Sequence, residues 1–377
     1  MKFFKKKLYD AELLWCTISL FLIGIIMITS SSISIANHLY KDPLFFTKKE
    51  ILYLIITLFL MYICLQIPIH YWKIHSIKIL LASVFMLILV LIISTPINGS
   101  LRWIEISIIH IQPSEISKIA IFCYFSNYIS RKHNEIINSF IGFLKPLGII
   151  CIISILLLME PDLGTVAIYF ITILSLLFIT GAQIWKFIPI ILLGIIATVV
   201  SITFIPYQNE RILSFLNPWK DPFGKGYQLT QSLMALGRGN VFGVGLGNSI
   251  QKLEYLPEAH TDFIFSIIGE ELGYFGSCII LSMILFVSFR ALKIGKEALK
   301  NNCLFSGNFA FSIGIWFMSQ TLINISTTIG ILPTKGLTLP LISYGGSSLL
   351  IISIAISILL RIDFETRINN KFYRGCK

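Results

Sequence analysis

The chain has 377 residues, of which 55% are hydrophobic and only 13% are charged, and its formal net charge is +11. Soluble domains carry about 25% charged residues, so this composition excludes a disordered chain and argues against a soluble enzyme. The mean hydropathy of +0.82 instead predicts a single all-α, polytopic membrane domain over residues 1–377. Basic residues stand in short loops between apolar runs, which indicates membrane anchoring and argues against a nucleic-acid partner.

Ten apolar runs are candidates for membrane-spanning helices, which need about 20 residues each. Only the short turn at Glu160-Pro161-Asp162 joins the fifth run to the sixth, which predicts a tight antiparallel hairpin. If the N-terminus lies inside, the inside segments carry nearly twice as many Lys and Arg residues as the outside ones. Both termini are therefore predicted to be cytoplasmic, with short tails at 1–12 and 362–377. The runs cover roughly 13–35, 50–67, 77–95, 113–130, 146–160, 163–181, 186–205, 262–289, 304–328 and 343–361.

One long connection, residues 206–261, falls on the outer face. Its Gly and Pro content and scattered aromatic residues predict an ordered, packed loop. The glycine runs are not a dinucleotide fingerprint, because no strand precedes them. Arg211 and Lys252 make the loop basic, and together with Arg102 and Lys335 they could bind a phosphate-bearing substrate. The alternative is a solvated basic loop that faces lipid headgroups.

The strongest chemical signal is the run from Leu256 to Phe265, where the outer loop becomes a helix. Asp262 lies there at the outer mouth of a span, and carboxylates in such places are functional candidates by default. Glu258 and His260 accompany it, and His260 is the only histidine near a carboxylate cluster. The alternative is that Thr261 or Asp262 merely caps the helix, since both residue types are favoured N-caps.

A second polar cluster precedes and opens the fourth apolar run. Pro113 suits the first turn of a helix, and Glu115 and Lys118 are three residues apart, so they can form an ion pair within it. That pair is either structural or part of a site. Arg102 and Trp103, at the outer face, are either an interfacial anchor or a site for an anionic headgroup.

The third cluster breaks the chain ahead of the tenth run. Prolines and glycines interrupt the helix over residues 332–348, where Lys335 projects at the outer end and Ser343 follows. Glu270 and Glu271 are expected to make hydrogen bonds between helices. The 7 cysteines include no CxxC pair, so neither a disulfide framework nor a zinc site is indicated.

Taken together, these motifs resemble the SEDS family (shape, elongation, division and sporulation), and residues 333–348 are more similar to its division branch than to its elongation branch. The resemblance covers about residues 13–365. It rests on Arg102-Trp103, Gln112-Pro113-Ser114-Glu115, Pro161-Asp162-Leu163-Gly164-Thr165, Gly226-Tyr227-Gln228, the run from Tyr255 to Phe265, Glu270-Glu271-Leu272-Gly273 and the run from Pro333 to Ser348.

The resemblance implies ten transmembrane helices and a peptidoglycan glycosyltransferase that polymerises lipid II during septal synthesis, with Asp262 as its catalytic residue. It implies a place in the bacterial cytoplasmic (inner) membrane at the division site. Implied partners are a class B penicillin-binding protein, which is a transpeptidase, other division membrane proteins and membrane lipid. The alternatives are a lipid II flippase, a division scaffold without catalysis, and a role in elongation.

One carboxylate suffices for this chemistry, because a pyrophosphate leaves without a strong general acid. Cationic side chains would offset the charge on the departing pyrophosphate. No cofactor is firmly expected. A divalent cation, Mg²⁺ or Mn²⁺, could share this role, although the sequence shows no dedicated metal cage. The residues expected to contact substrate are Arg102, Trp103, Glu115, Lys118, Arg211, Lys252, Glu258, His260, Lys335 and Ser343.

Overall fold

The computed structural model describes residues 9–94, 102–106, 109–192, 194, 215–224, 226–333 and 336–375. These residues form a helical bundle with one short hairpin, which confirms the predicted all-α membrane fold. The helices are α1 (Ala11–Tyr40), α2 (Phe45–Gln66), α3 (Ile69–Ile93), α4 (Pro113–Asn138), α5 (Phe140–Met159), α6 (Leu163–Ile179), α9 (Tyr227–Gly239), α10 (Ile264–Lys300), α11 (Leu304–Thr328) and α12 (Gly346–Gly375). The antiparallel hairpin pairs β1 (Ile104–Ile106) with β2 (Ile109–Ile111).

The membrane-spanning helices match the predicted apolar runs. Among the described residues, 7 helices are long and apolar enough to cross a membrane, namely α1, α2, α3, α5, α10, α11 and α12. The apolar helix α6 is shorter, and the 26-residue α4 is more polar. The remaining predicted run, 186–205, is helical over residues 188–192 and then lies largely outside the described residues.

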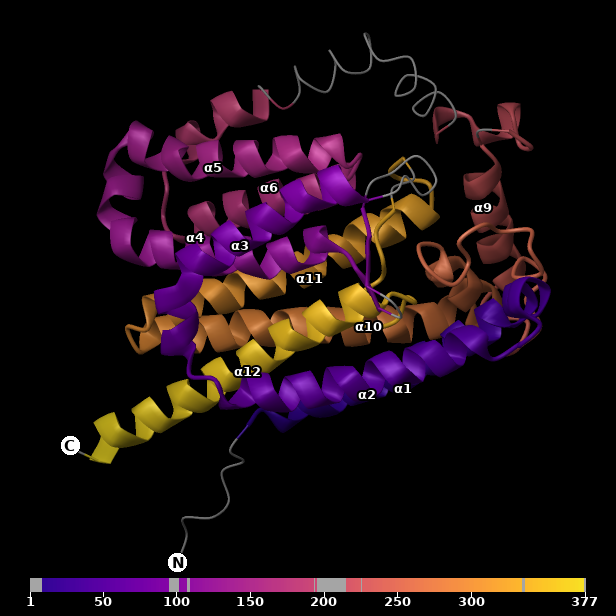
Figure 1. The fold of residues 1–377 in the computed structure, drawn as a ribbon, viewed down its shortest axis with the longest axis horizontal. Coiled ribbons are helices and arrows are strands. Elements are labelled where there is room, and N and C mark those ends of the chain that lie inside the picture. The colour runs from indigo at the N-terminus through magenta and orange to yellow at the C-terminus, as the bar shows by residue number, and fades with distance from the viewer. Residues whose placement is uncertain are drawn as a thin grey trace, which may run out of the picture.

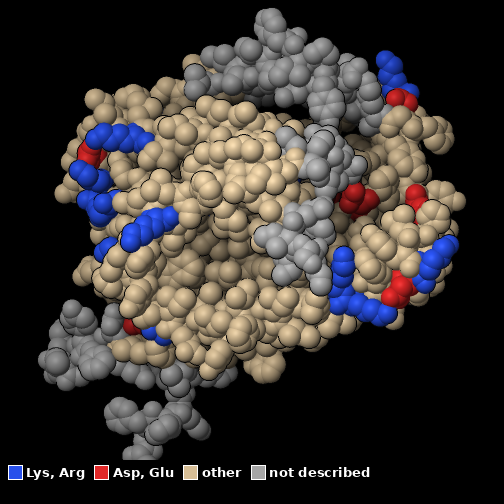
Figure 2. All heavy atoms as spheres, viewed as in Figure 1, with Lys and Arg blue, Asp and Glu red and all other residues tan. Residues whose placement is uncertain are grey.

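The spanning helices run roughly along one common direction, with α9 at one end and the C-terminal end of α12 at the other (Figure 1). Within this bundle α10 packs along α11, α12 along α2, and α3 along α4. Lys and Arg side chains gather towards the two ends of the visible face and leave a wide uncharged band between them (Figure 2). This distribution is the one expected of a protein whose middle is surrounded by lipid.

Local sequence explains where two of the helices begin. The side chain of Asp10 caps α1 by accepting hydrogen bonds from the backbone N–H groups of Glu12 and Leu13, each at 3.2 Å, as short polar side chains do at helix starts. Pro113 is the first residue of α4, as predicted from the lack of a backbone donor at that position. Asp10 also pairs with Arg290, which ties the start of α1 to the C-terminal half of α10.

The long helix α10 is broken at Gly273, whose φ of 70° and ψ of −170° lie outside the helical region. Four backbone hydrogen bonds join residues 240–245 to residues 270–275 at this break, with N···O distances of 2.9–3.1 Å. We call this contact the outer clip. It fixes the loop between α9 and α10 against the membrane bundle, and so it determines where the residues just before α10 lie.

Candidate active site

Asp262 lies in the turn immediately before α10, at the same end of the molecule as α9 (Figure 1). Its backbone carbonyl accepts a hydrogen bond from the side-chain amide of Asn324, at 2.9 Å, and the same amide donates to the carbonyl of Leu337, at 2.6 Å. Asn324 therefore ties the turn before α10 to the segment before α12. The residue before the first turn of α10 is Phe263, with no side-chain capping bond, so Asp262 does not serve as the cap of this helix.

Arg102 is held beside Asp262 by the turn between α5 and α6. Its Nε donates to the carbonyl oxygen of Glu160 at 3.1 Å, and its Nη2 donates to the carbonyl oxygen of Pro161. A Cβ atom added at Gly336 would lie 3.2 Å from Asp262 Oδ2 and 3.5 Å from Arg102 Nη1. The carboxylate and the guanidinium therefore converge at Gly336, which leaves room for both because it has no side chain.

The electrostatic surroundings of Asp262 favour its neutral form. Burial, together with the like charges of Glu258 and Asp162, raises the pKa of Asp262 and Arg102 lowers it, and the net result is a pKa of about 7. Desolvation of a carboxylate has this direction because water no longer stabilises the charged form. A carboxyl group with a pKa near neutrality can accept a proton efficiently at physiological pH, which is the property required of a general base.

Glu160 is a site residue that the sequence analysis placed only in a turn. It is completely buried, and neither of its carboxylate oxygens has a hydrogen-bond partner among the described residues. Burial and the charge of Asp162 raise the pKa of Glu160 to about 8, against the effect of Arg102. Its neighbour Asp162 instead caps α6 by accepting from the backbone N–H and the hydroxyl of Thr165. The sequence feature that could have identified Glu160 as a site residue is its position as a carboxylate in a turn between two apolar runs.

Glu115 and Lys118 form a buried ion pair that is connected to the segment before α12 through Gln320. Lys118 Nζ lies 2.6 Å from Glu115 Oε1 and 3.2 Å from Gln320 Oε1 on α11. The amide nitrogen of Gln320 donates to the carbonyl of Thr338 at 2.8 Å. Because Lys118 is completely buried, this pair acts on the site through the segment before α12, and direct contact with substrate stays a prediction.

Lys252 belongs to the anchor of the outer loop. Its Nζ lies 2.8 Å from Glu271 Oε1 and 3.0 Å from the hydroxyl of Ser30 on α1. The neighbouring carboxylate of Glu270 accepts from Arg238 at 2.7 Å and from the hydroxyl of Ser249. Glu270 and Glu271 thus bind the loop to the bundle, which extends their expected role in hydrogen bonding between helices.

The remaining predicted residues are distributed around Asp262. Glu258 is exposed and accepts from the hydroxyl of Thr261 at 2.7 Å. The carbonyl of His260 accepts from the backbone N–H of Tyr344 at 3.0 Å, and burial lowers the pKa of the His260 imidazole. Ser343 is buried, and its hydroxyl accepts from the N–H of Leu339 at 2.8 Å.

Three other residues were predicted to contact substrate, and the structure describes one of them. Trp103 is partly buried next to Arg102 in the chain. Arg211 and Lys335 lie outside the described residues. In the described part of the chain, no three His, Cys, Asp or Glu side chains gather as a metal site would require, and the divalent cation stays a prediction.

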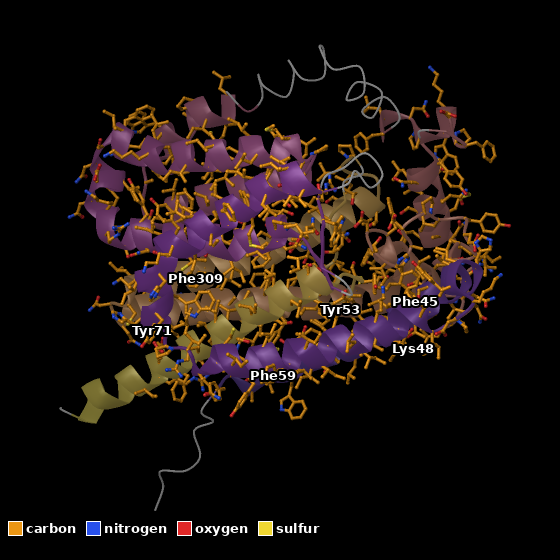
Figure 3. The ribbon with its side chains drawn as sticks, viewed as in Figure 1. Phe45, Lys48, Tyr53, Phe59, Tyr71 and Phe309 are labelled. Carbon is orange, nitrogen blue, oxygen red and sulfur yellow. The ribbon has the colours of Figure 1, made fainter. Side chains whose placement is uncertain are left out.

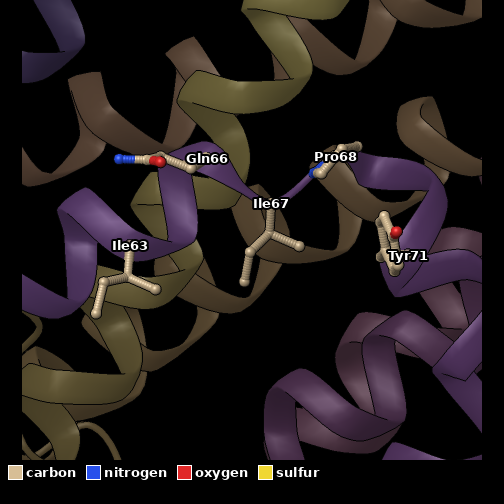
Figure 4. A pocket seen from close by; sticks show the side chains of 5 residues that line it. All are labelled: Ile63, Gln66, Ile67, Pro68 and Tyr71. Carbon is tan, nitrogen blue, oxygen red and sulfur yellow. The ribbon is translucent and has the colours of Figure 1, made fainter.

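A pocket of about 450 Å³ opens where α2 meets α3, far from this site. Its lining is mostly apolar, with Gln66 as the polar exception, and it includes Tyr71 (Figure 4). Tyr71 lies at the opposite end of the bundle from Phe45 (Figure 3). The pocket therefore has no part in the chemistry around Asp262.

Comparison with known proteins identifies relatives over almost the whole chain. The model of the FTSW_RODA_SPOVE family, described as cell cycle proteins, matches residues 11–368. A protein of Buchnera aphidicola subsp. Baizongia pistaciae, named as a probable peptidoglycan glycosyltransferase FtsW, is 66% identical, with 98% of this chain and 97% of the relative covered. A protein of the same name from Escherichia coli O6:H1 is 54% identical, with 98% and 90% covered.

Two solved structures share the fold. One is a chain from a peptidoglycan synthase complex that coordinates polymerization and crosslinking, with a TM-score of 0.79, 22% identity, and coverage of 95% of this chain and 98% of that chain. The other is the rod shape determining protein RodA of Thermus thermophilus, with a TM-score of 0.69, 21% identity, and coverage of 94% and 96%.

Proposed function

The chain belongs to the FTSW_RODA_SPOVE family of cell cycle proteins and is a division-associated peptidoglycan glycosyltransferase, and we propose that it polymerises lipid II with Asp262 as the general base. The observation that carries this proposal is the convergence of Asp262 and Arg102 at Gly336. One group is a proton acceptor with a pKa of about 7, and the other is a permanent cation. Glycosyl transfer from a sugar pyrophosphate can use both, the first for the acceptor hydroxyl and the second for the leaving group.

The proposed reaction uses these two groups in one step. The 4-hydroxyl oxygen of the acceptor sugar attacks C1 of the donor sugar, and its proton passes to the carboxylate of Asp262. As the new C–O bond forms, the bond between C1 and the pyrophosphate oxygen breaks, and the pyrophosphate leaves with the electron pair. Arg102 stabilises the negative charge that develops on this leaving group. The proton on Asp262 then returns to water at the outer surface.

The backbone bonds of Arg102 give its position a physical basis. Because Nε and Nη2 are held by carbonyls of the turn between α5 and α6, the guanidinium is fixed before substrate arrives. A cation that is already in place stabilises the transition state more than a cation on a flexible side chain does, since little reorganisation is needed when the leaving group becomes charged. This arrangement explains the use of arginine, whose planar fork can hold two backbone acceptors and still face an anion.

We further propose that the protein works in the cytoplasmic membrane at the division site, with Asp262 at the outer face and both termini in the cytoplasm. A class B penicillin-binding protein is the proposed partner. The similarity in fold to a chain of a peptidoglycan synthase complex supports this pairing, because a polymerase and a crosslinking enzyme act on the same glycan strand.

Replacement of Asp262 by Asn tests the catalytic role. Asn keeps the shape and the backbone contact to Asn324 but removes the proton acceptor, so we expect polymer formation from labelled lipid II to fall by about 10²–10⁴-fold. The purified variant should still fold and bind its partner. Near-normal polymer from Asp262→Asn would refute the proposed base. The transport and scaffold alternatives predict a different outcome: the purified wild-type protein itself would make no polymer from lipid II, because neither role includes catalysis.

A further inference from the structure

The outer turn between α1 and α2 carries an unusual group of aromatic and basic side chains. We call Tyr40, Lys41, Phe45, Phe46 and Lys49 the outer rim. The rings of Tyr40 and Phe45 stack with their centroids 3.8 Å apart, and Lys49 Nζ lies 4.6 Å from the centroid of the Phe45 ring. Figure 3 shows Phe45 at the end of α2 that is remote from Tyr71.

In the described part of the chain, no ion pair accounts for the two lysines of the outer rim. Lys and Arg are normally concentrated in cytoplasmic loops, so cations in this short outer turn work against the topology of the chain. The nearby Lys48 is paired with Asp42 at 2.6 Å. In contrast, no carboxylate in the described part of the chain forms an ion pair with Lys41 or Lys49. Two cations are thus available on the outer rim.

An aromatic surface continues from the outer rim to the catalytic turn. The ring of Phe46 lies 4.7 Å from that of His260 and 5.2 Å from that of Tyr344, measured between centroids. All three side chains are partly exposed. His260 is two residues before Asp262, so this surface reaches the turn that carries the proposed base.

The two approaches to Asp262 come from different elements and have different chemistry. Arg102 reaches it from the turn between α5 and α6 and suits a pyrophosphate. The outer rim approaches from α1 and α2 and contacts the turn before α10 through His260, and it combines rings with single cations. Ring faces suit the apolar faces of sugars, and exposed lysines suit carboxylates. The acceptor molecule of the reaction carries both kinds of group, since its sugars bear a short acidic peptide.

We propose that the outer rim binds the sugar–peptide headgroup of the acceptor, with Phe46 against a sugar ring and with Lys41 and Lys49 bound to carboxylates of the peptide. This inference rests on the proposed function, because it takes Asp262 as the group that meets the acceptor hydroxyl. It adds a second substrate contact, at the turn between α1 and α2, to the contact made by Arg102. It also gives the outer lysines a role that outweighs their topological cost.

The charge contribution can be tested with the double variant Lys41→Gln/Lys49→Gln in the purified full-length protein. Initial rates of polymer formation are measured against lipid II concentration, with the native peptide and with its carboxylates amidated. For native lipid II the variant should raise KM by about three- to tenfold with kcat unchanged, as expected for the loss of two exposed ion pairs. The wild type should show the same increase with amidated lipid II, and the variant should show no further increase.

Lys48→Gln is the matched control for charge, because Lys48 is already paired with Asp42, and its KM should equal that of the wild type. The aromatic contribution is tested by Phe46→Leu, which should raise KM for both forms of lipid II. Phe59→Leu is its control, since Phe59 lies on the same helix but is 64% exposed on the outside of the bundle (Figure 3).

An unchanged KM in the double variant would overturn the inference, as would equal sensitivity of variant and wild type to amidation. Lys41 is exposed and Lys49 is partly exposed, and neither forms an ion pair among the described residues, so the double variant should fold. Failure of the proposed function would look different: Asp262→Asn would then make polymer at a normal rate. If Asp262→Asn is inactive while the double variant has a normal KM, only the outer rim assignment is wrong.

Discussion

Asp262 is poised between its two protonation states at neutral pH because several nearby groups act on it in opposite directions. Burial and the carboxylates of Glu258 and Asp162 raise its pKa to about 7, while Arg102 lowers it. Only the ionised form can accept the proton of the acceptor hydroxyl. The rate should therefore rise with pH up to about 7 and level off above it, and below that midpoint it should fall by about tenfold per pH unit.

The substitution Glu258→Gln should move this midpoint. It removes a like charge that favours protonation of Asp262, so the pKa of Asp262 falls and the acid limb of the pH–rate profile shifts to lower pH. Glu258 is exposed, so the change should leave the fold intact. The measurement is kcat/KM for lipid II polymerisation between about pH 5.5 and 8.5. Glu254→Gln is the control, because the Glu254 carboxylate lies 3.9 Å from His38 Nδ1 and is not among the charges that act on Asp262. Equal shifts of the midpoint in both variants would contradict the assigned effect of Glu258 on Asp262.

At the residue scale, the sequence identifies the charged side chains but not which of them meet. The sequence analysis named Asp262 and Arg102, and the structure places them together at Gly336. It also named Lys252, which the structure pairs with Glu271, and Lys118, which it buries against Glu115. The first pair joins a loop to a helix and the second lies within one turn of a helix, and only the packing decides whether a cation faces substrate or a carboxylate.

The element that fixes the catalytic turn is the broken helix α10 with its outer clip. Gly243 lies in the clip with a φ of +80°, and an added Cβ atom would be 2.2 Å from the carbonyl oxygen of Glu271. A methyl group cannot occupy that space, so the loop would have to leave α10. The carboxylates of α10 that bind the loop would then lose their partners, and Asp262 would lose its fixed position.

We therefore expect Gly243→Ala to lower the thermal unfolding midpoint and to abolish polymerisation. Gly247→Ala is the matched control, because Gly247 also has a positive φ, of +83°, but no atom lies within 4 Å of its added Cβ. That control should show only the backbone strain of alanine in this conformation, about 1–2 kcal/mol, and should retain activity. Equal losses of activity in the two variants would contradict the structural role of the clip.

The helices themselves were well predicted where they cross the bilayer, and less well beyond it. The eighth run was expected at 262–289, whereas α10 extends to Lys300. Hydropathy does not detect the part of a helix that continues into water with charged side chains. The same holds for α12, which runs to Gly375 beyond the expected 361. Helix α9 was missed for a related reason: a short amphipathic helix within a loop has no long apolar run.

The molecule as a whole has two chemically different ends. The helix α9, the outer clip and Asp262 lie at one end, and the C-terminal end of α12 at the other (Figure 1). The excess of Lys and Arg in the segments at the latter end predicts that this end lies in the cytoplasm. This prediction follows from charge counts in the sequence.

The orientation predicts the labelling of single cysteines in a background without the native ones. A cysteine at Asn217, in the outer loop, should react with a membrane-impermeant thiol reagent in cells whose cytoplasmic membrane is intact. The control is a cysteine at Asn302, an exposed residue between α10 and α11, which should react only after permeabilisation. The reverse pattern would place the catalytic turn on the cytoplasmic side.

The outer clip also has a consequence for how the protein is made. Ser249 and Lys252 leave the ribosome before Glu270 and Glu271, which are the carboxylates that bind them. The loop thus crosses the membrane before its carboxylate partners exist, and it takes its final position only when α10 has been inserted. The turn at Asp262 takes its final position later still, because its carbonyl is bound by Asn324, which lies on α11. A nascent chain that stalls before α11 therefore lacks Asn324, so the turn that carries the proposed base has no fixed position even though the earlier helices are already in the membrane. On the proposed mechanism, such a chain cannot begin a glycan strand out of place.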